Sequence, residues 1–260
     1  MELETLLFSK KDAVGIITLN RPQQMNTLNG KMLEELNEVL VACENDLSVA
    51  ALVITGGVKS FCAGADVKYV TSFKTPGEFV AFSRLTRLTF HNIEVFNKPV
   101  IATMNGAALG GGLEMALCCD IRIASEKARM GLPEARLGAI PGAGGTQRLP
   151  RLIGVALAKQ IIFTGAHING AEAYQMGLVN KVVSADDCLD QAIEMVLEIS
   201  ERAPLALQAA KTCINTGIQI DLESALNYET QWSVHVVNSE DHEEGFKSFV
   251  EKRKPVWKGK

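Results

Sequence analysis

Apolar runs of strand length alternate with helical hydrophobic periodicity over the first two thirds of the chain. The runs end at Gly, Pro, Asn or charged residues, which is typical of buried strands. Strands are therefore predicted at residues 14–19, 50–55, 99–104, 120–124 and 178–183. Residues 31–43 instead place apolar side chains three and four positions apart, which predicts a helix. This alternation is typical of an α/β fold.

Capping signals and the change of periodicity define the remaining organisation. The segment Thr75-Pro-Gly-Glu78 predicts a capping box at the start of a helix that reaches about Val95. From about residue 185 onward the periodicity is helical only, and no flexible linker precedes this part. We therefore predict an α/β core over residues 1–195 and a helical region over residues 196–260.

The composition limits the classes of function. The chain has 260 residues, of which 47% are hydrophobic and 22% charged, as expected for a soluble globular protein with one sizeable core. The formal net charge is −4, so no overall positive field attracts nucleic acid. No apolar run is long enough to span a membrane, and the acidic N-terminus resembles neither a secretory signal nor an Arg-rich transit peptide. We expect a cytoplasmic protein.

Six cysteines are spread along the sequence without a Cys-x-x-Cys pair, and no histidine stands at metal-ligand spacing from them. Reduced thiols in a core are therefore expected rather than a disulfide framework or a metal site. Cys62 lies beside a candidate motif, but no histidine is near it in sequence to act as its base. We interpret it as a packing residue.

The most informative stretch is the glycine run Gly110-Gly111-Gly112, which follows the strand predicted at 99–104 and leads into a helix. Glycine lets a bound group approach the backbone, and the first N–H groups of a helix have no partner within it. Such donors favour an anion. A dinucleotide-binding fingerprint is one alternative, but the third glycine of Gly-x-Gly-x-x-Gly is missing. Tight helix packing is another, and the run alone does not decide between them.

A second turn offers a further backbone donor. The segment Phe61-Cys-Ala-Gly-Ala-Asp66 follows a predicted buried strand and leads into a short helix. Two N–H groups from separate turns that converge on one oxygen make an oxyanion hole, and the N–H of Ala65 is the candidate here. An ordinary strand-to-helix turn capped by Asp66 explains the segment equally well.

Two carboxylates accompany these donors. Glu114 follows the glycine run among apolar residues, and Glu134 follows Pro133 in a loop rich in glycine and apolar residues. A single Glu in either place is most often a solvated surface group. As a pair beside backbone donors they suit acid–base chemistry, since apolar surroundings and mutual repulsion raise at least one pKa.

These segments, in this order, resemble the crotonase (enoyl-CoA hydratase/isomerase) superfamily, and most closely the enoyl-CoA hydratases. The resemblance covers nearly the whole chain and is highly specific for the superfamily, but less so for one reaction within it. It rests on residues 15–22, 63–66, 105–114, 131–134, 140–148 and 249–254. It implies a β-β-α spiral core with a helical C-terminal part that usually organises trimers, paired into hexamers.

The resemblance also implies the site. Ala65 and Gly111 would supply the N–H groups that hold the thioester oxygen of an acyl-CoA, and Glu114 and Glu134 match the two catalytic glutamates of the hydratases. Superfamily members that isomerise double bonds or hydrolyse thioesters commonly lack one of the two. Glu114 would deprotonate the water that attacks Cβ, and Glu134 would deliver a proton to Cα. CoA is then part of the substrate, and no metal or redox cofactor is expected.

The resemblance implies further substrate contacts around the turn at residues 61–66 and beside Glu134. Ala63, Gly64 and Asp66 would contact the acyl-CoA, and Lys68 is placed to meet a CoA phosphate, although a solvated lysine explains it equally well. Leu132 stands where many hydratases have Gln. This departure bears on the acyl preference rather than on the class.

The C-terminal tail is basic and contains aromatic residues. Phe249 and Lys252 are the candidates in it for contacts near the CoA phosphates, contributed by a neighbouring subunit. A basic aromatic tail also suits a nucleic acid or a membrane surface, but the acidic net charge argues against either as the main partner.

The leading interpretation is reversible hydration of a 2-enoyl-CoA to a 3-hydroxyacyl-CoA. Among enzymes, the alternatives are an isomerase and a hydratase for a cyclic or branched enoyl-CoA. From another class, the alternative is a non-catalytic RNA-binding relative, against which the two glutamates argue. We expect an acyl-CoA and further copies of the chain, as a homohexamer, to be the partners.

Overall fold

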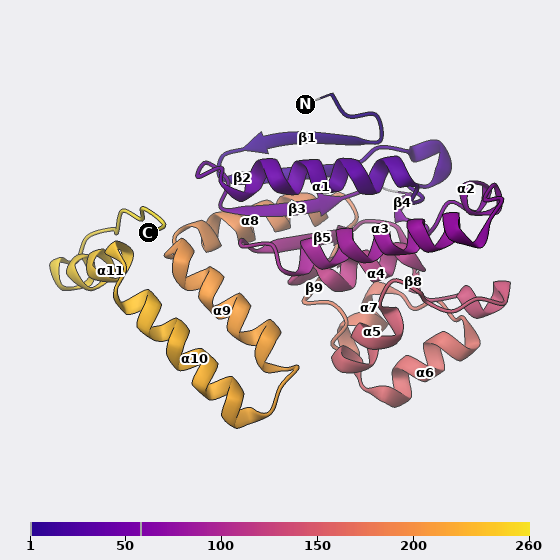
Figure 1. The fold of residues 1–260 in the computed structure, drawn as a ribbon. Helices are drawn as coiled ribbons and strands as arrows, with labels where there is room; N and C mark the ends of the chain where they lie inside the picture. Colours follow the sequence, from indigo (N-terminus) through magenta and orange to yellow (C-terminus); the bar gives the residue numbers. More distant parts are fainter. Residues whose placement is uncertain (1, 58) are drawn as a thin grey trace.

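A mostly parallel sheet of six strands forms the centre of the computed structural model, which describes residues 2–57 and 59–260 (Figure 1). The strand order is β1-β2-β3-β5-β7-β9. β1 and β2 form an antiparallel pair, and all later neighbours in this sheet are parallel. The strands are β1 (Leu6–Lys11), β2 (Val14–Leu19), β3 (Ala51–Thr55), β5 (Val100–Met104), β7 (Ile121–Ser125) and β9 (Lys181–Val183).

A second, smaller sheet of three parallel strands runs beside the first. It contains β4 (Ser60–Cys62), β6 (Ala107–Leu109) and β8 (Met130–Gly131), in that order. Each of them directly follows a strand of the large sheet, so β3, β5 and β7 each continue into one strand of the small sheet. The chain therefore repeats one strand–strand–helix unit, and the carboxyl ends of the three short strands meet at one edge.

Helices cover both faces of the large sheet. On one face the side chains of Leu52 and Ile54 join the core formed with α1, α3 and α4, and on the other Val53 packs against α8. This alternation is the period of two that a strand buried on both faces requires. The helices of this part are α1 (Gly30–Glu44), α2 (Val67–Thr71), α3 (Pro76–Glu94), α4 (Gly111–Cys118), α5 (Gly145–Ile153), α6 (Val155–Thr164), α7 (Gly170–Gln175) and α8 (Cys188–Ser200), with the short 3₁₀ helices η1 (Pro22–Gln24) and η2 (Glu134–Leu137).

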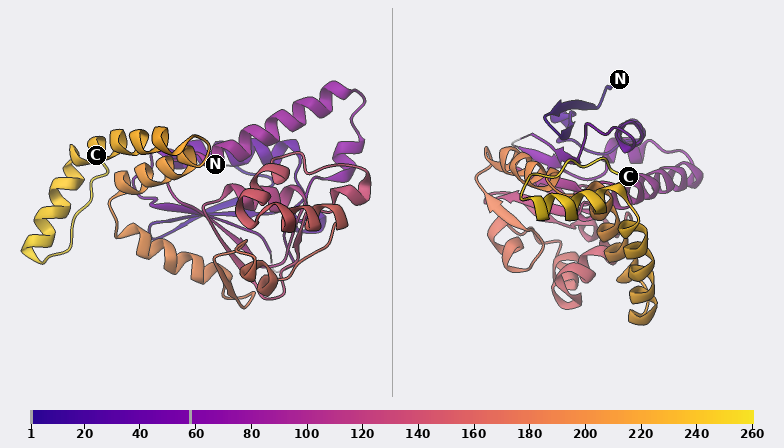
Figure 2. Two further views of the ribbon diagram at one scale, coloured as in Figure 1. Left: turned by 90° about the horizontal axis from the view of Figure 1, so that it is seen from below. Right: turned by 90° about the vertical axis from the view of Figure 1, so that its left-hand side faces the viewer.

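The last helices lie at the side of this core. α9 (Pro204–Gly217) and α10 (Leu222–Val237) form a helical hairpin, and α11 (Glu240–Glu251) follows at the end of the molecule farthest from α2 and α6 (Figures 1 and 2). The domain boundary predicted after residue 195 falls inside α8, whose buried residues pack on the sheet. The division into two domains stays a prediction.

The sequence predicted most of the long elements but not β1, and it predicted a strand over 178–183 where β9 covers only the last three of these residues. The capping box is confirmed, since the Thr75 side chain accepts a hydrogen bond from the N–H of Glu78 and the Glu78 carboxylate accepts one from that of Thr75. The prediction that the glycine run directly follows strand 99–104 was wrong, because β6 lies between them. Phe61 and Cys62, expected in a turn, belong to β4. Strands of two or three residues are too short to show a period.

The start of α4 packs directly against the end of β4. A Cβ atom added to Gly112 would lie 2.0 Å from the carbonyl oxygen of Cys62, a distance that no side chain tolerates. Only glycine therefore lets these two backbone segments approach so closely. This contact fixes the distance between the turns that follow β4 and β6.

Gly112→Ala should destabilise the protein by about 1–3 kcal/mol, the usual cost of overpacking a filled site. The urea midpoint of unfolding measures the effect. Gly77→Ala is the matched control, because Gly77 is also the second residue of its helix and an added Cβ would lie an ordinary 3.7 Å from Thr75 Oγ1. Equal midpoints for the two variants would contradict the close contact.

Candidate active site

The predicted site residues follow the carboxyl ends of the three short parallel strands. Ala65 comes three residues after β4, Gly111 two residues after β6, and Glu134 three residues after β8. Because neighbouring parallel strands end at the same edge, these positions gather there, as ligand sites commonly do in α/β sheets. Glu114 lies on the first turn of α4, one turn after Gly111.

Two backbone N–H groups converge at this edge. The N–H of Leu28 donates to the carbonyl oxygen of Gly64, and the N–H of Asp66 donates to that of Leu28, both at 2.8 Å. The N–H of Ala65 between them finds no acceptor among the described residues, and neither does that of Gly111 at the start of α4. A Cβ added to Gly111 would lie 3.7 Å from the nitrogen of Ala65. The two free donors are therefore close enough to bind one oxygen.

The backbone conformation before each donor requires glycine. Gly64 has a φ of +102° and Gly110 a φ of +52°, in the region that L side chains rarely adopt. The N–H groups of Ala65 and Gly111, which have no acceptor among the described residues, directly follow these two glycines. This arrangement suits stabilisation of an oxygen that becomes negative.

Glu114 is buried and held in one orientation. Its side chain is 3% exposed, and its Oε1 accepts hydrogen bonds from the N–H groups of Ala143 at 2.8 Å and Gly145 at 2.7 Å. Burial raises the pKa of this carboxyl, while the two N–H groups and the positive charge of Arg148 oppose the rise. The carboxylate is thus held in place by two donors, and its pKa lies above that of an exposed Glu.

Glu134 lies against the glycine run with far fewer partners. A Cβ added to Gly110 would be 2.9 Å from Glu134 Oε1, and the buried Oε2 accepts no hydrogen bond within the part of the chain that the structure describes. Burial, followed by the negative charge of Glu114, raises the pKa of Glu134 to about 7. At neutral pH the group can therefore give or take a proton.

Three of the residues for which the resemblance implies contacts with the acyl-CoA lie in or just after the turn at residues 61–66. The Asp66 carboxylate caps α2 through the N–H of Tyr69 at 3.2 Å and pairs with the Arg21 guanidinium at 2.7 Å. Its capping role is therefore confirmed, and its contact with substrate stays a prediction. Ala63 donates its N–H to the carbonyl oxygen of Met25, and Lys68 is exposed on α2.

Leu132 is fully buried beside the first glutamate. Its Cδ1 would lie 2.8 Å from a Cβ added to Gly145, and Glu114 Oε1 would lie 3.0 Å from the same atom. The apolar side chain therefore lines the surroundings of Glu114, where a Gln would bring a polar amide. Its effect on acyl preference stays a prediction.

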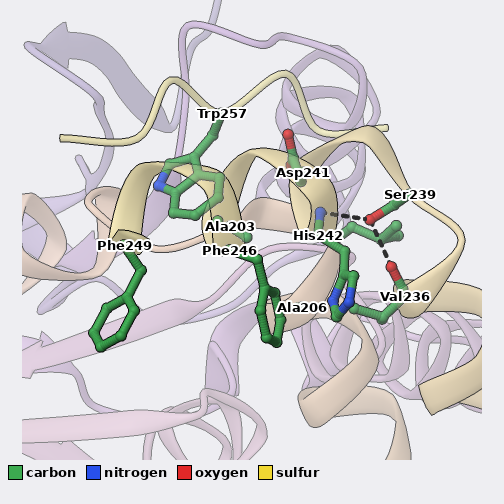
Figure 3. A pocket seen from close by; sticks show the side chains of 11 residues that line it. Ala203, Ala206, Val236, Ser239, Asp241, His242, Phe246, Phe249 and Trp257 are labelled. Atoms are coloured by element: carbon green, nitrogen blue, oxygen red, sulfur yellow. Dashed lines mark hydrogen bonds between the residues drawn. The ribbon is translucent and has the colours of Figure 1, made fainter. Parts of the chain in front are cut away.

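Phe249 and Lys252 lie at the C-terminal end of α11, remote from the glutamates within one chain (Figure 1). Phe249 lines a cavity of about 330 Å³ together with Phe246 and Trp257, whose rings Figure 3 shows around it. Lys252 follows the helix with a φ of +54°. A role for either near CoA requires a second copy of the chain, as the sequence interpretation proposed.

Sequence reasoning missed the residues that orient Glu114. Ala143 and Gly145 supply its hydrogen bonds, and the Arg148 guanidinium donates to the carbonyl oxygen of Ala143 at 3.1 Å. Residues 140–148 contributed to the resemblance, yet nothing in their spacing indicates which N–H groups point at a carboxylate. The consecutive glycines Gly144 and Gly145 at the start of α5 were the available signal of a close backbone approach.

Other kinds of site find little support in residues 2–57 and 59–260. No three His, Cys, Asp or Glu side chains there lie close enough together to hold a metal ion. In the same ranges no helix combines the length and hydropathy needed to cross a membrane. Five of the six cysteines are buried, and Cys213 is half-buried.

Comparison with known proteins agrees with this geometry. A crystal structure of an enoyl-CoA hydratase from Bacillus anthracis superposes with a TM-score of 0.95 at 42% identity, covering 99% of this chain and 100% of that one. The fold is therefore the crotonase-type α/β fold. The short-chain-enoyl-CoA hydratase of Clostridium acetobutylicum is 44% identical, over 98% of this chain and 97% of its own length. The crotonyl-CoA hydratase of Syntrophomonas wolfei is 41% identical, over 98% of both.

The sequence pattern of the enoyl-CoA hydratase/isomerase family matches residues 9–260. The chain belongs to this family. The resemblance found from the sequence alone is confirmed in its fold and in its class of enzyme.

The raised pKa of Glu134 predicts a pH-dependent stability. A carboxyl whose pKa rises on folding from 4.5 to about 7 binds more protons in the folded state, so its contribution to stability is lost as pH rises through this window. Glu134→Gln has no carboxyl to ionise at this position, so it should not lose this stability as the pH rises. The variant should unfold at a higher temperature than the wild type near about pH 8, and the difference should shrink towards about pH 5.

Glu198→Gln, an exposed position on α8, is the control for a general charge effect. Calorimetry at both pH values measures the unfolding temperatures. A difference between Glu134→Gln and the wild type that is the same at both pH values would contradict the raised pKa.

Proposed function

We propose that this enoyl-CoA hydratase adds water reversibly to a 2-enoyl-CoA, with Ala65, Gly111, Glu114 and Glu134 as its catalytic groups. The observation that carries the proposal is the placement of two free N–H groups, one buried carboxylate and one half-buried carboxylate at one sheet edge. The relatives' names, a short-chain-enoyl-CoA and a crotonyl-CoA hydratase, support a short 2-enoyl-CoA as the first substrate to assay.

The N–H groups of Ala65 and Gly111 would bind the thioester oxygen. Water addition puts negative charge on this oxygen as an enolate forms, and donors already in place stabilise that charge without reorganisation. In comparable sites one such donor contributes about 2.7–4 kcal/mol. These N–H groups would bind the oxygen more tightly once it carries negative charge, so they would stabilise the transition state more than the substrate.

Glu114 and Glu134 would exchange protons with the substrate on either side of the double bond. Glu114, oriented by two N–H groups, takes a proton from the water whose oxygen bonds to Cβ. Glu134, protonated in part near neutral pH, gives a proton to Cα. In the reverse reaction the roles exchange. Because the charge of Glu114 raises the pKa of Glu134, the two titrate as a coupled pair.

Glu114→Gln and Glu134→Gln should each lower kcat by about 10²–10⁴-fold, since each removes one proton transfer. KM should change little, because both substitutions retain the shape of the site. Loss of the conjugated enoyl-thioester absorbance with crotonyl-CoA measures hydration, and a thiol reagent detects any release of free CoA.

Two results would contradict this proposal. Release of free CoA without hydration would indicate a thioester hydrolase, and wild-type turnover retained in the double variant would exclude the glutamates. A panel of branched, cyclic and longer enoyl-CoAs then separates the alternative substrates. RNA binding without turnover by the wild type would favour the non-catalytic alternative.

We propose further that the chain forms a homohexamer, a dimer of trimers, through its C-terminal helices. The hairpin of α9 and α10 supports this, since it exposes a large apolar surface that a stable monomer rarely presents. Its exposed members include Ile214, Ile218, Leu222 and Leu226. Such a neighbour could also bring Phe249 and Lys252 to a CoA. The cytoplasmic location stays a prediction.

The wild type should sediment as one species of six chain masses, and Ile218→Glu should shift it to smaller species, because a charge on the apolar surface would be buried unpaired. Sedimentation velocity at several concentrations measures both. A monomeric wild type would contradict the proposal. Leu47→Glu, also at an exposed apolar residue but before β3, should leave the mass unchanged.

A further inference from the structure

The turn that orients Glu114 is itself held by a side chain. The N–H of Ala143 donates to Glu114 Oε1, and the carbonyl oxygen of the same residue accepts a hydrogen bond from Arg148 Nη1 at 3.1 Å. Arg148 lies on the first turn of α5, directly after the turn it contacts. The guanidinium thus fixes the peptide group that presents one of the two N–H donors.

A second carboxylate fixes the guanidinium in turn. Arg148 Nε donates to Glu94 Oε1 at 3.1 Å, and Nη2 donates to Glu94 Oε2 at 2.7 Å. Both side chains are partly buried, with 23% of Arg148 and 34% of Glu94 exposed. A bidentate pair of this kind defines orientation as well as distance. Glu94 is the last residue of α3, so the pair joins α3 to α5.

The middle of the turn fits around Arg148. Gly144 has a φ of +114°, and a Cβ added there would lie 1.9 Å from Arg148 Nη1. The turn therefore has the one residue type that allows it to wrap around the guanidinium. Its two flanking N–H groups, from Ala143 and Gly145, then point at the same carboxylate oxygen.

We propose that Arg148, oriented by Glu94, is a positioning residue that aligns the turn at 143–145 with Glu114. The inference rests on the proposed function, since it assigns a role through Glu114. Arg148 itself contacts the turn and not the reacting atoms. An ion pair that only stabilises the fold would leave the titration of Glu114 unchanged.

The test measures Glu114 directly as well as turnover. The carboxyl bands in infrared difference spectra, wild type against Glu114→Gln, follow the titration of Glu114 in the absence of substrate. Arg148→Met should move this titration to higher pH, because a positive charge that favours the ionised form is removed and the N–H donors of the turn are loosened. It should also lower kcat about 10–100-fold with KM changed less than about threefold, as expected when a fixed geometry is loosened.

Two further variants separate charge from geometry. Arg148→Lys retains the charge but not the fork, so it should restore the titration and not the full rate. Arg151→Met, one turn later on α5, is the matched control, because Arg151 is exposed and its Nη1 donates to the carbonyl oxygen of Gln147. It should behave as the wild type.

An Arg148→Met variant whose Glu114 titrates as in the wild type would overturn the proposal, whatever its thermal stability. So would a kcat equal to that of Arg151→Met. Failure of the proposed function gives a different result, since a wild type that hydrates no enoyl-CoA still reports the titration of Glu114 in the infrared spectra.

Discussion

The site depends on the close approach of two backbone segments, the end of β4 and the start of α4. Gly112 allows the carbonyl oxygen of Cys62 to occupy the space that a side chain would fill. One residue earlier, Gly111 then presents its N–H within reach of the N–H of Ala65. Neither donor has an acceptor among the residues that the structure describes, although an unpaired N–H is normally costly. The fold thus leaves the N–H groups of Ala65 and Gly111 free to bind a substrate oxygen.

The two glutamates have opposite surroundings at this edge. Glu114 is almost wholly buried but receives two N–H groups and the field of Arg148, which favour its ionised form. Glu134 is less buried, yet its Oε2 has no protein donor within the described ranges and it experiences the charge of Glu114. Burial raises the pKa of both carboxyls, and two N–H groups and the charge of Arg148 oppose the rise at Glu114. The hydrogen-bond pattern therefore matches the roles proposed for them.

The sequence predicted the two glutamates far better than the short strands and the side chains that hold them in place. The capping box at Thr75 and the strands β2, β3, β5 and β7 follow from local rules, because caps and apolar runs involve consecutive residues. Glu114 and Glu134 could be selected because each stands beside glycine-rich backbone. β4, β6 and β8 have two or three residues each and carry no period. The pairing of Glu94 with Arg148 joins positions 54 residues apart, and only the fold brings them together.

An ion pair between α9 and the loop before β7 stabilises the packing of α9 on the core. Lys211 on α9 donates to Asp120 Oδ2 at 2.8 Å, and the same oxygen accepts the N–H of Val100 at 2.7 Å at the start of β5. Burial raises the pKa of Asp120, and the charge of Lys211 is the first of the effects that oppose the rise. Without α9 this carboxylate would lose its compensating cation, and uncompensated buried charge is strongly destabilising.

A second contact reaches the catalytic turn. Asn215, one helical turn after Lys211, donates to the carbonyl oxygen of Glu94 at 3.1 Å, and the Glu94 carboxylate orients Arg148. A chain of direct contacts therefore runs from α9 to the N–H groups that hold Glu114. A displacement of α9 would first change the hydrogen bond from Asn215 to Glu94, and only through it the position of the Glu114 carboxylate. The helical region thus contributes to the geometry of the site within a single chain, independently of any neighbour it binds.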